Sequence, residues 1–181
     1  MTNKCFGWAQ TIGWLALAWP SVLGAAGLTF QLLDYPNARE TNPTCIDGQG
    51  IAGSYVDGSY IIRGFYWNES GFKPVGKPDG WQIVVSATSG GNVVGRYQYI
   101  IDPHVVDPVR AFFWNGSVSL DLIPPDSVRD VYAVGVSGNL VVGYYRDAAS
   151  YVHGFLWNGS AYTSFDALGS PGTWPRAISG T

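Results

Sequence analysis

The stretch HGFLWN, residues 153–158, has two earlier counterparts in the chain, RGFYWN at 63–68 and RAFFWN at 110–115. Their tryptophans stand 47 and 43 residues apart. A second block precedes each copy, with an aliphatic residue first, Gly third and Tyr fifth: IAGSY at 51–55, VVGRY at 93–97 and VVGYY at 141–145. Two blocks recurring in a fixed order at nearly constant spacing indicate a repeat protein.

A small polar residue followed by glycine lies ahead of each second block and predicts a turn that leads into a strand. These pairs are Asp47-Gly48, Ser89-Gly90 and Ser137-Gly138. Ser179-Gly180 repeats the pattern, but the block that should follow it would lie beyond Thr181. We therefore expect about three and a half units, and either a fragment, a truncated product or a last sheet completed by another chain.

Within a unit the hydrophobic period is two, which is the period of a strand. His153, Phe155 and Trp157 fall on one face, and Gly154 and Leu156 on the other. Both faces are largely apolar, so we expect layers on both sides. The first unit divides into strands at 42–47, 50–57, 61–67 and 71–75. The prediction is an all-β chain with a repeat of about 43 residues and four short antiparallel strands per unit, which favours a partial or open β-propeller.

The domain prediction has two parts, an N-terminal signal at 1–26 and one β-repeat domain at 27–181. Its units are expected near 28–68, 69–115, 116–158 and, incomplete, 159–181. We expect Gly and aromatic residues to form the repeated core: Gly53, Phe65, Trp67, Gly95, Phe112, Trp114, Gly143, Phe155 and Trp157.

The second unit is longer than the others between its glycine and its tryptophan. Gly95 and Trp114 are 19 residues apart, whereas the corresponding separations in the other two units are 14. The extra residues fall in 97–108, a segment expected to project as a loop, and insertions in repeat proteins often lie on the binding face. Asp102, His104 and Asp107 are its candidate binding residues.

The N-terminus has the features of a secretory signal. Lys4 precedes the apolar stretch 12–23, and small residues at 24–26 are typical of a cleavage site. An uncleaved membrane anchor and a buried core helix are the alternatives. Signal cleavage would leave Cys45 as the one cysteine, too few for a disulfide scaffold or a Cys-based metal site.

The blocks HGFLWNGSAYTSFD at 153–166 and RAISG at 176–180, with the VVG-x-Y element, resemble the HAF family of probable extracellular repeats. The resemblance extends over nearly the whole chain after the signal. It departs from the family motif where Arg63 and Arg110 replace His. The family implies export and modular β architecture, and it supplies no catalytic residue.

Single-residue motifs favour structural roles. Asn-x-Ser sequences at 68–70, 115–117 and 158–160 match the glycosylation pattern, but they occupy a hairpin position that suits a turn. His153 shares its repeat position with two arginines, which suggests a structural hydrogen-bond donor. Asp57, Asp102 and Asp147 follow the Tyr-containing strands and suit turns better than calcium ligands.

No nucleophile or cofactor motif is present in the sequence, and no metal or cofactor is expected. The net charge is −3, without a basic cluster, so nucleic acid is not an expected partner. We expect a secreted, cell-surface or periplasmic protein that binds an unidentified glycan or protein and has no membrane span after signal cleavage. A self-assembling scaffold, associating through the incomplete last unit, and a secreted propeller-type hydrolase are the alternatives.

Overall fold

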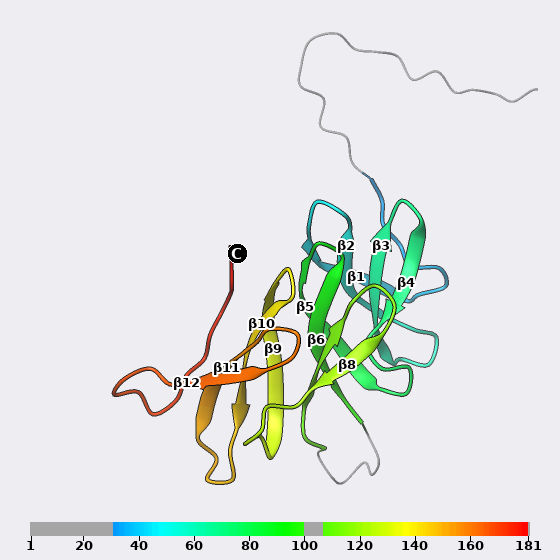
Figure 1. The fold of residues 1–181 in the computed structure, drawn as a ribbon. Helices are drawn as coiled ribbons and strands as arrows, with labels where there is room; N and C mark the ends of the chain where they lie inside the picture. The colour runs from blue at the N-terminus through cyan, green and yellow to red at the C-terminus, as the bar shows by residue number, and fades with distance from the viewer. Residues whose placement is uncertain (1–30, 100–106, 181) are drawn as a thin grey trace, which may run out of the picture. The chain divides into compact units, whose positions relative to one another are not determined.

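The computed structural model describes residues 31–99 and 107–180, so the predicted signal at 1–26 lies outside the described residues. In this part of the chain the structure contains strands and no helix (Figure 1). The strands are β1 (Glu40–Ile46), β2 (Ile51–Val56), β3 (Ile62–Asn68), β4 (Gly71–Val75), β5 (Trp81–Ser89), β6 (Asn92–Gln98), β7 (Arg110–Trp114), β8 (Ser119–Leu122), β9 (Arg129–Ser137), β10 (Leu140–Arg146), β11 (Val152–Trp157) and β12 (Tyr162–Phe165).

These strands form three four-stranded sheets, each an antiparallel meander in chain order: β1 to β4, β5 to β8, and β9 to β12. The all-β prediction is confirmed, and the short antiparallel strands are grouped in fours, as expected. In the first sheet each observed strand lies within two residues of the range expected from the sequence. No fourth sheet is present in the described part of the chain, where β12 is the last strand.

The repeated glycine of each second block lies opposite an irregularity in the neighbouring strand. Gly95 pairs with Val85, and the register shifts between Val85 and Ala87. The first and third sheets shift in register at the corresponding place, beside Gly53 and Gly143. A Cβ at any of the three glycines would overlap a backbone carbonyl oxygen of that strand. The motif therefore requires glycine because two backbones approach closely at a β-bulge.

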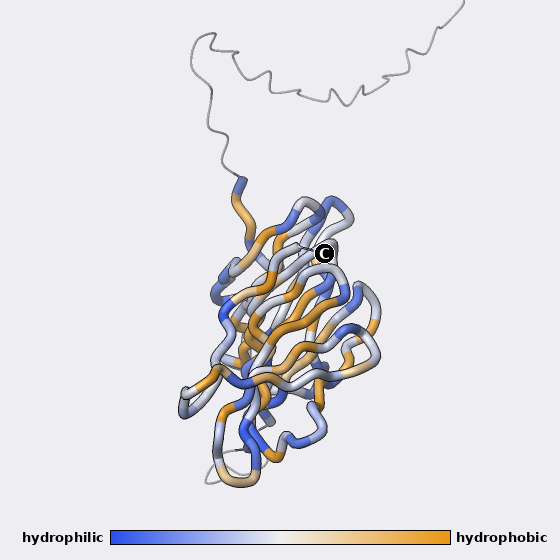
Figure 2. Tube along the Cα trace, turned by 60° about the vertical axis from the view of Figure 1, so that its left-hand side comes forward, coloured by the Kyte–Doolittle hydropathy of each residue, from blue (hydrophilic) through white to orange (hydrophobic). Residues whose placement is uncertain are grey.

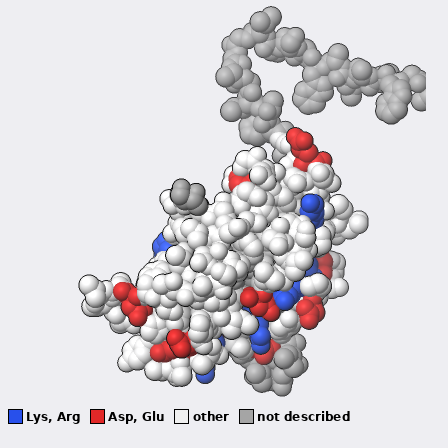
Figure 3. Space-filling view, in the orientation of Figure 1, with Lys and Arg blue, Asp and Glu red and all other residues white. Residues whose placement is uncertain are grey.

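Hydrophobic residues concentrate along the strands, and hydrophilic residues occupy many of the connections between them (Figure 2). Figure 3 shows a broad uncharged surface in the centre of the view, with acidic and basic side chains gathered mainly below and beside it.

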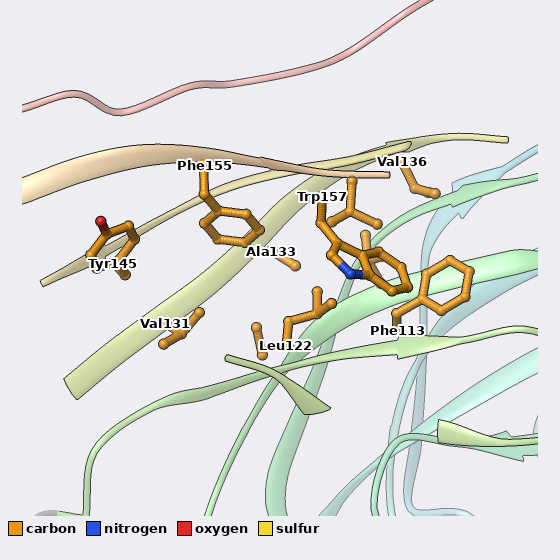
Figure 4. Packing of buried hydrophobic residues seen from close by; sticks show 11 residues of the cluster. Phe113, Leu122, Val131, Ala133, Val136, Tyr145, Phe155 and Trp157 are labelled. Carbon is orange, nitrogen blue, oxygen red and sulfur yellow. The ribbon is translucent and has the colours of Figure 1, made fainter. Parts of the chain in front are cut away.

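The sheets pack face to face through the repeated aromatic residues. Between the second and third sheets, Phe113 contacts Trp157 with ring centroids 5.0 Å apart (Figure 4). Between the first and second sheets, Tyr66 contacts Trp114 at 5.6 Å. Each tryptophan thus packs against the residue that precedes the tryptophan of the preceding sheet.

The same relation explains why one predicted core residue is less buried than the others. Trp67 is half-buried, because no described strand precedes the first sheet and offers a ring to it. The other eight predicted core residues are buried: Gly53, Phe65, Gly95, Phe112, Trp114, Gly143, Phe155 and Trp157.

Hydrogen bonds accepted by repeated polar residues join the first hairpin turns of neighbouring sheets. The Asp47 carboxylate accepts from the Thr88 hydroxyl at 2.9 Å and from the Gly91 amide at 3.1 Å. Ser89 Oγ, at the corresponding position of the second sheet, accepts from the Gly138 amide at 3.2 Å. The small polar residue before Gly therefore connects sheets as well as turning the chain.

Candidate functional site

Most of the longer connections between strands lie at one end of the three sheets. This end holds the β2–β3 and β10–β11 connections, the described ends of the β6–β7 connection, and the segments that lead from one sheet to the next. Arg63 donates to the carbonyl oxygens of Pro78 and Gly80, at 3.0 and 2.9 Å, and brings the start of β3 to the start of β5. The Val131 amide donates to the Val109 carbonyl oxygen at 2.9 Å, which brings the start of β9 to the start of β7. We call this end the loop rim.

Two connections at the loop rim have the same architecture. Asp57 Oδ1 accepts from the backbone amides of Ser59 and Ile61, at 2.8 and 3.0 Å. Asp147 Oδ1 accepts from the Tyr151 amide at 2.8 Å. The predicted turn role of both aspartates is confirmed, and Asp102 lies outside the described residues.

The second carboxylate oxygen of each aspartate contacts the repeated donor on the following strand. Asp57 pairs with Arg63 at 3.3 Å, and Asp147 Oδ2 contacts His153 Nε2 at 3.2 Å. Arg110, the third residue at this repeat position, instead lies over the Tyr99 ring, 5.7 Å from its centroid. We expected this residue to donate a hydrogen bond to the backbone of a neighbouring unit. Arg63 does so, at the segment that leads into β5. His153 instead contacts the carboxylates of Asp147 and Asp166.

His153 lies between two carboxylates. Its Nδ1 contacts both Asp166 oxygens, at 2.9 and 3.0 Å, while its Nε2 contacts Asp147. Partial burial lowers the pKa of His153, but the hydrogen bonds and negative charges of the two aspartates outweigh it and raise the pKa above 6.5. Both ring nitrogens donate in the imidazolium form, so this form satisfies both carboxylates at once.

Four Tyr and Trp side chains of the described residues are exposed at the loop rim. Tyr60 and Tyr151 belong to the β2–β3 and β10–β11 connections and are 69% and 61% exposed. Trp81, 37% exposed, begins β5, and Trp174, 49% exposed, follows the bridge between Gly172 and Val152. The guanidinium of Arg39 lies 4.0 Å from the centroid of the Tyr60 ring. We call these four residues the aromatic set.

The predicted binding loop is described only at its ends. Asp102 and His104 lie outside the described residues. Asp107 lines a cavity of about 440 Å³, together with Pro108, Val128, Arg129 and Asp130. The end of the insertion therefore borders a cavity between the second and third sheets.

Metal-ligating side chains do not cluster in the described ranges, and the described cysteine, Cys45, is half-buried. Within residues 31–99 and 107–180, no group of three His, Cys, Asp or Glu side chains could hold a metal ion. Burial raises the pKa of the Cys45 thiol to about 11, which keeps it protonated at neutral pH. No helix in these ranges is long and apolar enough to cross a membrane.

Comparison with known proteins gave no match among family models, curated proteins or solved structures. The geometry therefore carries the functional argument. Sequence reasoning missed the aromatic set because Tyr60, Trp81, Tyr151 and Trp174 lie outside the repeated blocks and at unequal repeat positions. One sequence feature could have identified Tyr60 and Tyr151 as loop residues. Each follows, within four residues, an aspartate at the end of a Tyr-containing strand.

Proposed function

We propose that this chain is an exported, non-catalytic repeat protein of the HAF kind that binds its ligand at the loop rim. Its three sheets would be successive blades of a β-propeller. Support for this arrangement comes from the innermost strands, since β5 lies against both β1 and β9. Support for the repeat also comes from Thr173, whose amide donates to Val152 as the amide of Val131 donates to Val109.

The observation that carries the binding proposal is the exposure of the aromatic set at one end of the sheets. An exposed Tyr or Trp ring presents a flat apolar face and a polar edge, which suits stacking against sugar rings or protein side chains. Burying these rings in a complex would remove apolar surface from water, a favourable contribution to binding. The ligand class under the proposal is a glycan or a protein.

The His153 site favours binding over catalysis. A general base needs a free ring nitrogen near the substrate. Asp147 and Asp166 engage both ring nitrogens of His153, and Asp147 also holds its own turn. These three residues therefore form a structural clasp at the loop rim rather than the acid and base of a hydrolase.

The test is retention of the purified chain by insoluble polysaccharides such as cellulose, chitin and peptidoglycan, and by a set of immobilised extracellular proteins. Tyr60→Ala and Tyr151→Ala should each weaken the retention found. Val118→Ala is the matched control, because Val118 is also exposed but belongs to the β7–β8 turn at the other end of its sheet. Equal retention of all three variants would contradict a site at the loop rim.

Self-association through residues 166–180, which follow β12, is the alternative proposal for this chain. Light scattering over a range of protein concentrations separates the two. A constant monomer mass in a chain that still binds its ligand favours binding without assembly, and a mass that rises with concentration favours the scaffold.

A further inference from the structure

A groove opens on the loop rim between the second and third sheets. It consists of two adjoining cavities, of about 440 and 150 Å³, which share Pro108, Val128 and Arg129. Arg110, at the start of β7, and Arg129, at the start of β9, both line the smaller cavity. The larger volume lies within the range of about 300–1,000 Å³ that is usual for small-ligand sites. We call this the arginine groove.

The two arginines supply positive charge to the groove. Arg110 and Arg129 are exposed, and neither forms a hydrogen bond from its side chain or an ion pair within the described ranges. Two acidic residues of the groove have partners of their own. Asp121 contacts Lys77 at 3.2 Å and accepts from the Tyr97 hydroxyl at 2.7 Å.

The second of these carboxylates belongs to Asp130. It pairs with Arg146 at 3.6 Å and accepts from the Val109 amide at 3.3 Å. The third acidic residue, Asp107, lines the larger cavity and is partly buried. The two guanidinium groups are thus exposed charges of the groove that a ligand can meet.

Apolar surface borders these charges. Ile123 and Val128 line the smaller cavity and are 64% and 57% exposed. The Tyr99 ring lies beneath Arg110. A ligand that fits must therefore offer an anionic group beside an apolar face. A hexuronic acid unit does so, because its carboxylate projects from a ring whose faces carry C–H groups.

We propose that the arginine groove binds a carboxylate of an acidic polysaccharide, with Arg110 and Arg129 donating hydrogen bonds to it. Guanidinium groups suit this role because their planar donors match both oxygens of a carboxylate. The proposal rests on the binding function proposed above and names the chemical class of its ligand. The aromatic set would contact further sugar units along the rim.

The test is calorimetric titration of the full chain with trigalacturonic acid and with the methyl ester of the same trisaccharide, which lacks the charge. We expect binding of the acid, at least about tenfold weaker binding of the ester, and weaker binding of the acid at higher NaCl concentration. Arg110→Gln and Arg129→Gln should each weaken binding of the acid about tenfold. Arg176→Gln is the control, because Arg176 is also exposed but does not line the groove.

Three results would overturn the proposal. The first is equal affinity for acid and ester, and the second is unchanged binding by both groove variants while circular dichroism shows them folded. The third is binding of oligoglutamate as tight as that of the acid, which would assign the groove to acidic protein segments. If the chain binds a neutral polysaccharide through Tyr60 and Tyr151 but not trigalacturonate, the groove proposal fails and the proposed function stands. If it binds none of the polysaccharides or proteins tested, both fail.

Discussion

The indole of Trp157 packs against the ring of Phe113 from the neighbouring sheet, with ring planes 63° apart and centroids separated by 5.0 Å. Trp114 and Tyr66 make the corresponding contact one sheet earlier. A single repeat position thus joins sheets that are distant in sequence, and it explains why the tryptophan recurs in HGFLWN and its counterparts.

Replacing Trp157 with Ala should lower the free energy of unfolding by about 3–5 kcal/mol, because it leaves a cavity between two sheets. Urea denaturation followed by circular dichroism measures the change. Trp67→Ala is the matched control at the same repeat position, and it should cost clearly less because Trp67 is only half-buried. Equal losses for the two variants would contradict the packing described here.

Gly143→Ala should also destabilise the fold. An added Cβ would overlap the carbonyl oxygen of Tyr132 and crowd the ring of Phe155, so the bulge of β9 would have to move. Gly48→Ala is the control, because a Cβ there meets no atom within 4 Å. Thermal unfolding of the two variants is the measurement. A melting temperature for Gly143→Ala equal to that of Gly48→Ala would show that the glycine is not needed for close approach.

The His153 clasp predicts a pH dependence of stability. Since the pKa of His153 is higher in the folded chain than its ordinary value of 6.5, protonation favours the folded state. Its contribution is full below about pH 6.5 and is lost as the pH rises through the folded pKa. NMR titration of the imidazole signals should therefore give a pKa above 6.5, and Asp166→Asn should lower it. A pKa at or below 6.5 in the folded chain would contradict the clasp.

The Asp147 carboxylate responds in the opposite direction. Partial burial raises its pKa, but hydrogen bonds from His153 and from backbone amides outweigh that effect and leave the pKa below 3.8. Its stabilising contribution is therefore present above about pH 3.8 and is lost as the pH falls through the folded value. Asp147→Asn should reduce the loss of stability on acidification, measured as unfolding free energy at pH 5 and pH 3. An unchanged loss would assign acid sensitivity to other groups.

The Asp47 carboxylate offers a test of the bonds between hairpin turns. Asp47→Ala would remove acceptors for Thr88 and Gly91 of the next sheet, at a cost of about 1–3 kcal/mol. The measurement is the denaturation midpoint, and the control is Asp126→Ala, because Asp126 is exposed and its side chain has no hydrogen bond or ion pair to the described residues. Equal midpoints would show that the Asp47 hydrogen bonds do not stabilise the contact between the first two sheets.

Much of the fold could be predicted because the repeated blocks are recognisable in a single sequence. The aliphatic-x-Gly-x-Tyr and Phe-x-Trp blocks give the strands, their period of two gives burial on both faces, and the Asn-x-Ser positions give turns. The turn interpretation is confirmed where Asn115 Oδ1 accepts from Ser117 and Val118. The β-bulge opposite Gly143 could not be predicted, because it depends on where two backbones meet.

The candidate site was less predictable for a related reason. Exposure is a property of the assembled sheets, so Tyr60 and Trp81 could not be separated in the sequence from core aromatics. The arginine groove joins residues 19 positions apart, Arg110 and Arg129, that belong to different sheets. The insertion at 97–108 pointed toward this region, and Asp107 at its end lines the adjoining cavity.

The most direct test of binding at the loop rim is NMR of the tryptophan indole N–H signals during titration with the polysaccharide or protein that the chain retains. The account predicts that the signals of Trp81 and Trp174 shift, while those of the buried Trp114 and Trp157 remain in place. Shifts confined to Trp67, or to residues of the β3–β4 and β7–β8 turns at the other end of the sheets, would contradict it.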